Sequence, residues 1–69
     1  MKLKNNLHVL RAEQKWTQQY VAEQLGVSRQ TINSLEANKY NPSLILAFQI
    51  ARLFGKEVTD IFSIEEEEK

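Results

Sequence analysis

The chain of 69 residues contains no cysteine, one proline and two glycines. Without cysteine it has no disulfide, no thiolate metal ligand and no thiol nucleophile. Its longest unbroken apolar run, Leu44 to Phe48, falls far short of the roughly 20 residues that a membrane span needs. The first ten residues lack the apolar stretch and cleavage site of a secretory leader. We therefore expect a cytoplasmic protein.

The chain also lacks a net charge, but its charges are unevenly distributed. Residues 1–64 hold eight basic and five acidic residues, a net charge of +3, whereas residues 65–69 hold four acidic and one basic, a net charge of −3. We expect residues 1–64 to form one domain, followed by an acidic solvated tail at residues 65–69. The weakly positive domain is compatible with a partner that has an acidic backbone, such as a nucleic acid.

The sequence predicts an all-α fold, a compact bundle of five helices. It contains no Asn-Gly or Asp-Gly hairpin signal and no long alternating β-branched run. Leu3, Leu7 and Leu10 recur at helical spacing, so we expect the first helix to begin at Lys2 or Leu3 and to end near Gln14. The later helices are expected at residues 17–25, 28–37 and 44–54, with a last short turn that Thr59 caps.

Residue types at the helix ends support these boundaries. Thr17, Ser28 and Ser43 are N-cap types, and Gly26, Asn38 and Gly55 suit the left-handed position past a helix end. Only Gln49 and Arg52 are polar within residues 44–54. We therefore expect that helix to be the central one, buried nearly all round.

The predicted helix at residues 28–37 has an unusual outer side. Ile32 and Leu35 must face the core, and the opposite side carries no acid. That outer side consists of Arg29, Gln30, Asn33, Ser34 and Ala37. Arg pairs bidentately with guanine, and Gln or Asn pairs with adenine, in the major groove of DNA. The pattern predicts a surface that contacts bases; the alternative is a polar surface that contacts only water.

Residues 17–36, TQQYVAEQLGVSRQTINSLE, have the layout of two crossed helices joined by a tight turn. Ala22 leaves room where the two helices approach, and Gly26 allows the turn. Such a helix-turn-helix places its second helix in the major groove, while its first helix crosses the phosphate backbone.

The chain resembles the phage-repressor class of helix-turn-helix regulators, the Cro and lambda-repressor-like family, in its short single-domain form. The resemblance extends over nearly the whole chain and rests on Leu10-Arg11, Thr17-Gln18, Leu25-Gly26-Val27-Ser28, Ile32, Leu35-Glu36, Tyr40-Asn41-Pro42-Ser43-Leu44 and Ile61-Phe62. It implies a five-helix fold, binding of double-stranded DNA as a homodimer, no catalysis and no cofactor.

The resemblance also implies roles for particular residues. The positions that face bases are Arg29, Gln30, Asn33 and Ser34. The positions that contact the DNA backbone are Thr17, Gln18, Ser28 and Lys39. A further pair, Arg11 and Glu36, is expected to form an ion pair that clamps the first helix to the third; the alternative is two unrelated surface charges worth about 0–1 kcal/mol.

Two features depart from the family pattern. Lys15-Trp16 stands where the family commonly has Gly followed by Leu, so Lys15 is expected to be left-handed or the turn to differ locally. Trp16 is expected to be partly buried. Ile45 lies on the outer side of its helix, and we expect it to join Leu46, Leu53 and the last turn in a dimer contact.

An enzyme is not expected. The single histidine, His8, lies opposite the apolar stripe of its helix, and no glycine-rich phosphate loop or metal-binding spacing is present. The sequence predicts a DNA-binding regulator, a repressor that binds a near-palindromic operator. The alternative is an antitoxin-like or other protein-binding module, for which Ile45, Val9 and the acidic tail would supply contacts.

Overall fold

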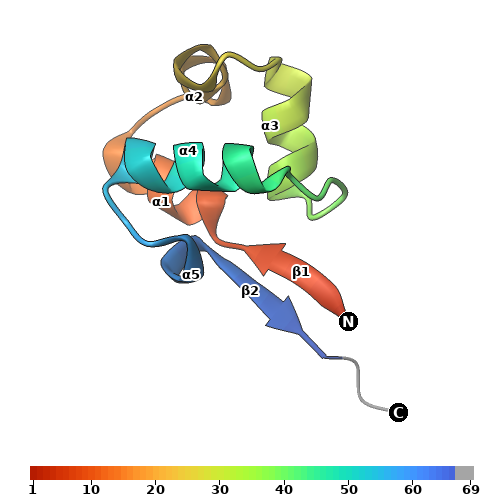
Figure 1. The fold of residues 1–69 in the computed structure, drawn as a ribbon. Coiled ribbons are helices and arrows are strands. Elements are labelled where there is room, and N and C mark those ends of the chain that lie inside the picture. Colours follow the sequence, from red (N-terminus) through yellow and green to blue (C-terminus); the bar gives the residue numbers. More distant parts are fainter. Residues whose placement is uncertain (67–69) are drawn as a thin grey trace.

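The computed structural model describes residues 1–66. Within them the chain forms five helices and a two-stranded sheet (Figure 1). In chain order the elements are β1 (Lys2–Asn5), α1 (Leu7–Gln14), α2 (Gln18–Leu25), α3 (Arg29–Glu36), α4 (Leu44–Phe54), α5 (Val58–Ile61) and β2 (Phe62–Glu65). The expected number of helices is confirmed, but the two strands mean that the fold is not strictly all-α.

Three helices begin at the hydroxyl residues that the sequence predicts. Thr17, Ser28 and Ser43 each accept a hydrogen bond from the backbone N–H three residues later, at 3.0, 3.1 and 3.1 Å. Each such cap satisfies a backbone donor that the helix leaves unpaired, worth about 1 kcal/mol.

Four residues adopt the left-handed conformation that ends a helix or a turn. Gly26 and Gly55 end α2 and α4 with φ of 71° and 65°, and Asn38 follows α3 with φ of 59°. Lys15 ends α1 with φ of 61°, as expected where the family has glycine. A non-glycine residue there costs about 1–2 kcal/mol, so the rest of the α1–α2 turn must hold Lys15 in place.

The core lies between the helices, and α5 and the start of β2 contribute to it. Its buried members are Leu7, Leu10, Val21, Ala22, Ile32, Leu35, Leu46, Ala47, Ile50, Ala51, Ile61 and Phe62. The expected contact between α2 and α3 is confirmed, because Val21, Ala22, Ile32 and Leu35 belong to one buried cluster and the two helices are in contact. Ala22 therefore has no room for a larger side chain without moving one helix.

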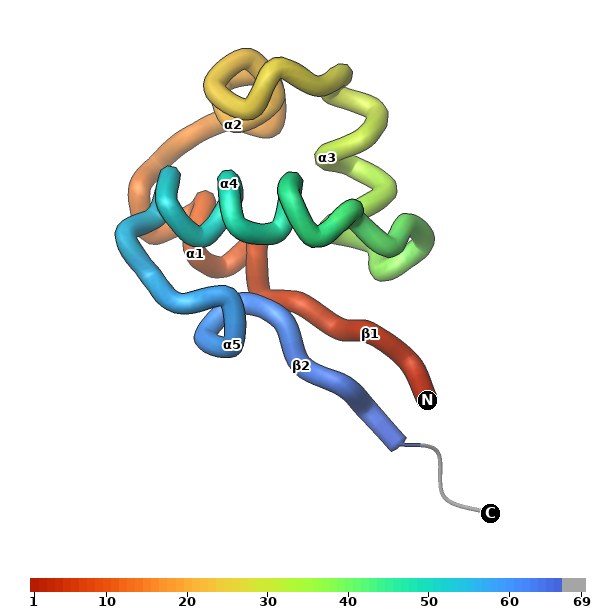
Figure 2. Tube along the Cα trace, viewed as in Figure 1, coloured from red at the N-terminus to blue at the C-terminus, as the bar shows by residue number. Residues whose placement is uncertain are grey.

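The expectation that the first helix begins at Lys2 or Leu3 is wrong. Residues 2–5 form β1, which pairs antiparallel with β2, so that Leu3 lies opposite Ile64 and Asn5 opposite Phe62. Figure 2 shows the two strands side by side although they come from opposite ends of the chain. The Asn5 side chain accepts a hydrogen bond from Leu7 N–H at 2.9 Å, and α1 begins at that residue.

The C-terminal part also differs from the expectation. The last helix, α5, begins after Glu57 rather than Thr59, because Glu57 N–H donates to the Asp60 carboxylate at 3.0 Å in a capping box. Glu65 lies in β2, with its carboxylate 3.8 Å from Lys4 Nζ, so the strand includes the first residue of the expected tail. Residues 67–69 of the expected acidic tail lie outside the described residues.

The helix α4 is buried on one side only, which corrects the expectation of burial nearly all round. Leu46, Ala47, Ile50 and Ala51 are buried in the core. The opposite side is exposed to solvent and carries Leu44, Ile45 and Phe48. A helix that is apolar on both sides in a single small domain leaves one apolar side without a partner inside the domain.

Candidate nucleic-acid interface

The outer side of α3 gathers the residues that the sequence predicts to contact bases. Arg29, Gln30 and Asn33 are exposed and border one shallow hollow on the surface. Ser34 is half-buried, and it borders a neighbouring hollow together with Gln30. Because Ile32 and Leu35 are fully buried, the helix cannot rotate to hide this face. The structure therefore brings all four predicted side chains to one side.

The start of α2 lies beside the start of that face. Thr17, Gln18 and Arg29 border one hollow, although Arg29 comes from α3. The first backbone N–H groups of α2 form a helix N-terminus, which favours a bound anion such as a phosphate. The Thr17 hydroxyl already accepts one hydrogen bond, from Tyr20 N–H, as the N-cap of α2, and its O–H is still able to donate to a phosphate.

Ser28 and Lys39 lie at the two ends of α3. Ser28 caps the helix and also shares a hydrogen bond of 2.9 Å with the Thr31 hydroxyl. Lys39 follows α3, its backbone N–H donates to Ser34 O at 2.9 Å, and its side chain is exposed. Both residues border the hollow that contains Ser34, so they flank the face from either end.

An ion pair holds α3 to α1, as the family resemblance implies. Arg11 Nε lies 2.7 Å from Glu36 Oε2, and Arg11 Nη2 donates to Glu36 Oε1 at 3.1 Å. The two side chains are only 21% and 9% exposed. A bidentate guanidinium–carboxylate pair of this kind fixes the relative orientation of the two helices as well as their distance.

This pair belongs to a larger network that sequence reasoning missed. The guanidinium of Arg11 donates through Nη1 to the Trp16 carbonyl oxygen at 2.9 Å, and Gln18 Nε2 donates to Glu36 Oε1 at 3.1 Å. The network therefore joins α1, the turn with left-handed Lys15, the start of α2 and the end of α3. Gln18, predicted only as a DNA contact, is also part of this support.

The electrostatics of the network favour its charged form. Burial by itself raises the pKa of Glu36, but hydrogen bonds from Arg11 and Gln18, together with the charge of Arg11, outweigh burial and lower that pKa below its ordinary value. The hydrogen bond to Glu36 raises the pKa of Arg11 despite the opposing effect of its burial. Within residues 1–66, no buried side-chain nitrogen or oxygen lacks a hydrogen-bond partner.

Comparison with known proteins agrees with this geometry. The helix-turn-helix family model matches residues 7–61, a span from α1 to α5. The chain belongs to the phage-repressor-like helix-turn-helix family.

Relatives of this helix-turn-helix protein are similar along most of their length. An uncharacterized helix-turn-helix transcriptional regulator of Methanocaldococcus jannaschii is 52% identical over 66 residues, covering 96% of this chain and 100% of that protein. The uncharacterized regulator YgzD of Bacillus subtilis is 40% identical, covering 94% and 98%. A crystal structure of a candidate DNA-binding protein from Bacteroides fragilis has a TM-score of 0.80 and 31% identity, covering 88% and 98%.

A second contact that the sequence did not predict joins the C-terminal end of α3 to β1 in this helix-turn-helix domain. Asn5 Nδ2 donates to the Leu35 carbonyl oxygen at 2.8 Å and to Asn38 Oδ1 at 3.2 Å. The Leu35 carbonyl lies in the last turn of α3, where it also accepts a hydrogen bond from Asn38 N–H at 3.0 Å, so Asn5 adds a second donor there. No local signal marks this contact, because Asn5 and Leu35 are 30 residues apart in the sequence.

Trp16 supports the same turn from the outside of the helix-turn-helix. It is half-buried, as expected, and its ring lies 5.1 Å from the Tyr20 ring and 5.3 Å from the Phe54 ring, centroid to centroid. These tilted aromatic contacts are typical of stabilising pairs. Trp16 thereby joins the turn after α1 to the start of α2 and to the end of α4.

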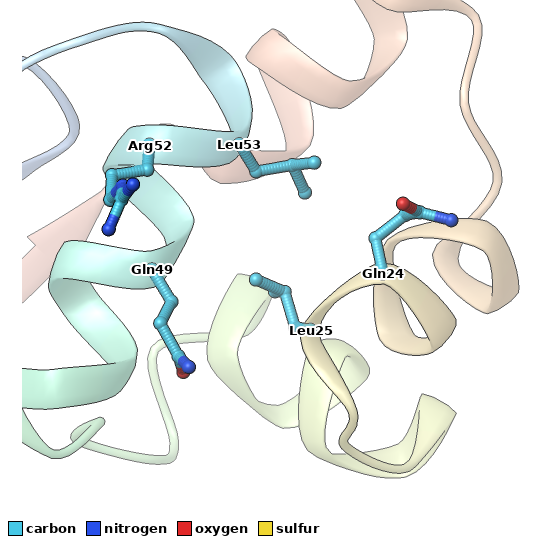
Figure 3. A pocket seen from close by; sticks show the side chains of 5 residues that line it. All are labelled: Gln24, Leu25, Gln49, Arg52 and Leu53. Carbon is cyan, nitrogen blue, oxygen red and sulfur yellow. The ribbon is translucent and has the colours of Figure 1, made fainter.

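The hollow between α2 and α4 is of a different kind (Figure 3). Leu25 and Leu53 extend into the space between the two helices, and Gln24, Gln49 and Arg52 surround it. Both leucines pack against the core. Leu46 is buried at 7% exposure and so has little surface left for the expected dimer contact with Ile45, whereas Leu53 is half-buried beside α2.

The described part of this helix-turn-helix chain contains no candidate metal site and no helix that could span a membrane. Within residues 1–66, no group of three or more acidic or histidine side chains is placed to hold a metal ion, and His8 is exposed. None of the helices in that range combines the length and the apolar character needed to cross a membrane.

Proposed function

We propose that this helix-turn-helix protein is a sequence-specific DNA-binding regulator that represses transcription by occupying its operator. The observation that carries the proposal is the acid-free outer side of α3, where Arg29, Gln30 and Asn33 are exposed together. Guanidinium and amide groups match the hydrogen-bonding edges of guanine and adenine in the major groove.

The proposed contacts fall into two groups with different effects. Arg29, Gln30, Asn33 and Ser34 contact bases and supply the sequence preference. Thr17, Gln18, Ser28 and Lys39 contact phosphates and fix how the domain sits on the duplex, without distinguishing one sequence from another. Their positions at the start of α2 and at both ends of α3 support this division.

The proposed regulator acts as a homodimer on a near-palindromic site. Two copies related by a two-fold axis place their α3 helices in successive major grooves on one face of the DNA, roughly 34 Å apart. Each copy then contacts one half-site.

The proposed role is DNA binding and not catalysis, and the protein acts in the cytoplasm, where it associates with the nucleoid. Residues 1–64 supply the DNA-binding domain, and residues 65–69 carry a net charge of −3.

The naming of the relatives supports the same conclusion. The Methanocaldococcus and Bacillus proteins are both named as helix-turn-helix transcriptional regulators, and this chain covers 100% and 98% of their lengths. The similarity therefore extends over nearly the whole of each relative, so this chain has a residue aligned with nearly every position of these two regulators.

Selection of bound sequences from a random pool of duplex DNA, at a stated salt concentration, tests the proposal. We expect enrichment of a consensus with two inverted half-sites. A pool that stays unenriched would contradict the proposal and favour the alternative, an antitoxin-like or other protein-binding module whose main partner is a protein.

A further inference from the structure

The outer side of α4 carries three large apolar side chains that solvent contacts freely. Leu44, Ile45 and Phe48 are 71%, 74% and 55% exposed. Phe48 lies four residues after Leu44 and three after Ile45, so it is the neighbour of both on the same side of the helix. We call these three residues the α4 apolar patch. The remaining large exposed apolar residues within 1–66 come from other elements: Met1, Val9, Tyr20, Tyr40 and Ile64.

We propose that the α4 apolar patch is the surface through which a second copy of this chain binds, in a two-fold dimer with the two α4 helices packed antiparallel. The inference rests on the proposed function, which requires a dimer but does not say where the two copies meet. In this arrangement Ile45 and Phe48 of each copy pack against the same residues of the other.

The size of the patch fits a second copy better than an unrelated protein. Three such side chains expose an apolar area on the order of 300–600 Å², the range of the largest patch on a typical monomer. A stable complex needs roughly 800 Å² on each partner. A two-fold contact that also has DNA beneath it can be smaller, because neighbouring half-sites raise the effective concentration of one copy near the other.

The charges on α4 favour the antiparallel arrangement. The helix, LILAFQIARLF, contains no acid, and its only charged residue is Arg52, one turn beyond Phe48. An antiparallel pair places the two Arg52 side chains at opposite ends of the contact, whereas a parallel pair would place them together, where like charges repel. An uncharged apolar patch binds best to a partner surface that is also uncharged and apolar, and the α4 apolar patch of a second copy is such a surface.

The position of the patch leaves the DNA-contact residues free. The connection of residues 37–43 joins the end of α3 to the start of α4 (Figure 1). None of the patch residues belongs to the outer side of α3. Pairing through α4 therefore joins two recognition helices close to one axis without covering Arg29, Gln30 or Asn33.

Sedimentation equilibrium of the full chain tests the dimer contact without DNA. We expect a concentration-dependent monomer–dimer equilibrium that changes little with salt, since the contact is apolar. The changes Ile45→Glu and Phe48→Glu should raise the dissociation constant by about 100-fold or more, because each copy would bury an unpaired carboxylate. Val9→Glu is the matched control on α1, where the original side chain is also exposed, at 43%; it should leave the constant unchanged.

A second arm uses the selected DNA, as the full palindrome and as a single half-site. Ile45→Glu should keep its helical circular dichroism and its half-site affinity, while losing the cooperative binding of a second copy to the palindrome. An unchanged dimer in both patch variants would overturn the inference, and so would a wild-type chain that stays monomeric at all concentrations and binds the palindrome one to one. Failure to enrich any DNA would contradict the proposed function, whereas sedimentation would still decide the contact.

Discussion

The outer sides of α3 and α4 are both exposed and free of acid, but only the α4 side carries large apolar side chains. The α3 side offers guanidinium, amide and hydroxyl groups and no large apolar side chain, whereas the α4 side offers Leu44, Ile45 and Phe48 before the polar Gln49 and Arg52. Hydrogen-bonding groups in fixed positions suit base edges, and apolar groups suit another apolar surface. The difference indicates that two neighbouring helices of one small domain serve two different partners.

The two helices are also held in place by different interactions. Burial of Leu46, Ala47, Ile50 and Ala51 fixes α4, and the side-chain hydrogen bond found there among the described residues is the Ser43 cap. The helix α3 has buried residues too, but polar contacts join its C-terminal end to α1 and β1: the Arg11–Glu36 pair and the hydrogen bond from Asn5 to Leu35 O. A helix that must present donors at set positions gains from such directional contacts.

The largest expected effect comes from removing a base contact on α3. Arg29→Ala should weaken operator binding by about 1–3 kcal/mol for each half-site and relax the preference at one base pair there. Competition binding of operator against random duplex measures the change. Arg52→Ala, which removes the same group from exposed α4, should leave the ratio of the two affinities unaltered. Equal loss on both DNAs for Arg29→Ala would count against base contact.

The next effect concerns the support beneath the α3 face. Arg11→Ala should lower the free energy of unfolding by about 2 kcal/mol, between the value of exposed pairs and that of fully buried ones. Thermal denaturation would then shift downward by roughly 10 °C for a domain of this size. Arg52→Ala is again the control, since it removes a guanidinium from an exposed position. A variant that unfolds at the wild-type temperature would disprove the role of the clamp.

The expected pH dependence follows from the lowered pKa of Glu36. A carboxyl group whose pKa is lower in the folded state stabilises the fold fully above its unfolded pKa, about 4.3, and loses that contribution as pH falls through the folded pKa. The stability difference between wild type and Glu36→Gln should stay constant from pH 7 to about 5.5 and shrink below about pH 4. Urea denaturation across this range measures it, and a difference that grows on acidification would have the wrong sign.

The smallest expected effect comes from a phosphate contact at the end of α3. Lys39→Gln should weaken binding to operator and to random DNA alike, because phosphates carry no sequence information. It should also reduce the slope of log affinity against log salt concentration by about 1 for each half-site. Titrations between low and moderate salt measure the slope, and a loss confined to the operator would instead make Lys39 a specificity residue.

The sequence was sufficient where the deciding interactions are local. A cap such as Thr17 bonds a backbone group three residues away, and Gly26 ends its helix by its own conformation, so both could be predicted. The buried side of α3 followed from the spacing of Ile32 and Leu35. The Arg11–Glu36 pair was predicted from family resemblance, because its partners are 25 residues apart.

The sequence was insufficient where partners come from distant parts of the chain. β1 forms only because β2, about 60 residues later, pairs with it, and Asn5 reaches α3 only once that strand is in place. For α4, an apolar composition predicted burial on all sides, but a domain of 69 residues has too few other elements to cover both sides.

Intermolecular nuclear Overhauser effects in a complex of isotope-labelled protein with unlabelled operator duplex test the central claim most directly. The account predicts contacts from the side chains of Arg29, Gln30 and Asn33 to base protons in the major groove, and no contact from Ile45 or Phe48 to DNA. Contacts from the outer side of α4 to DNA, with the outer side of α3 still exposed to solvent, would contradict it.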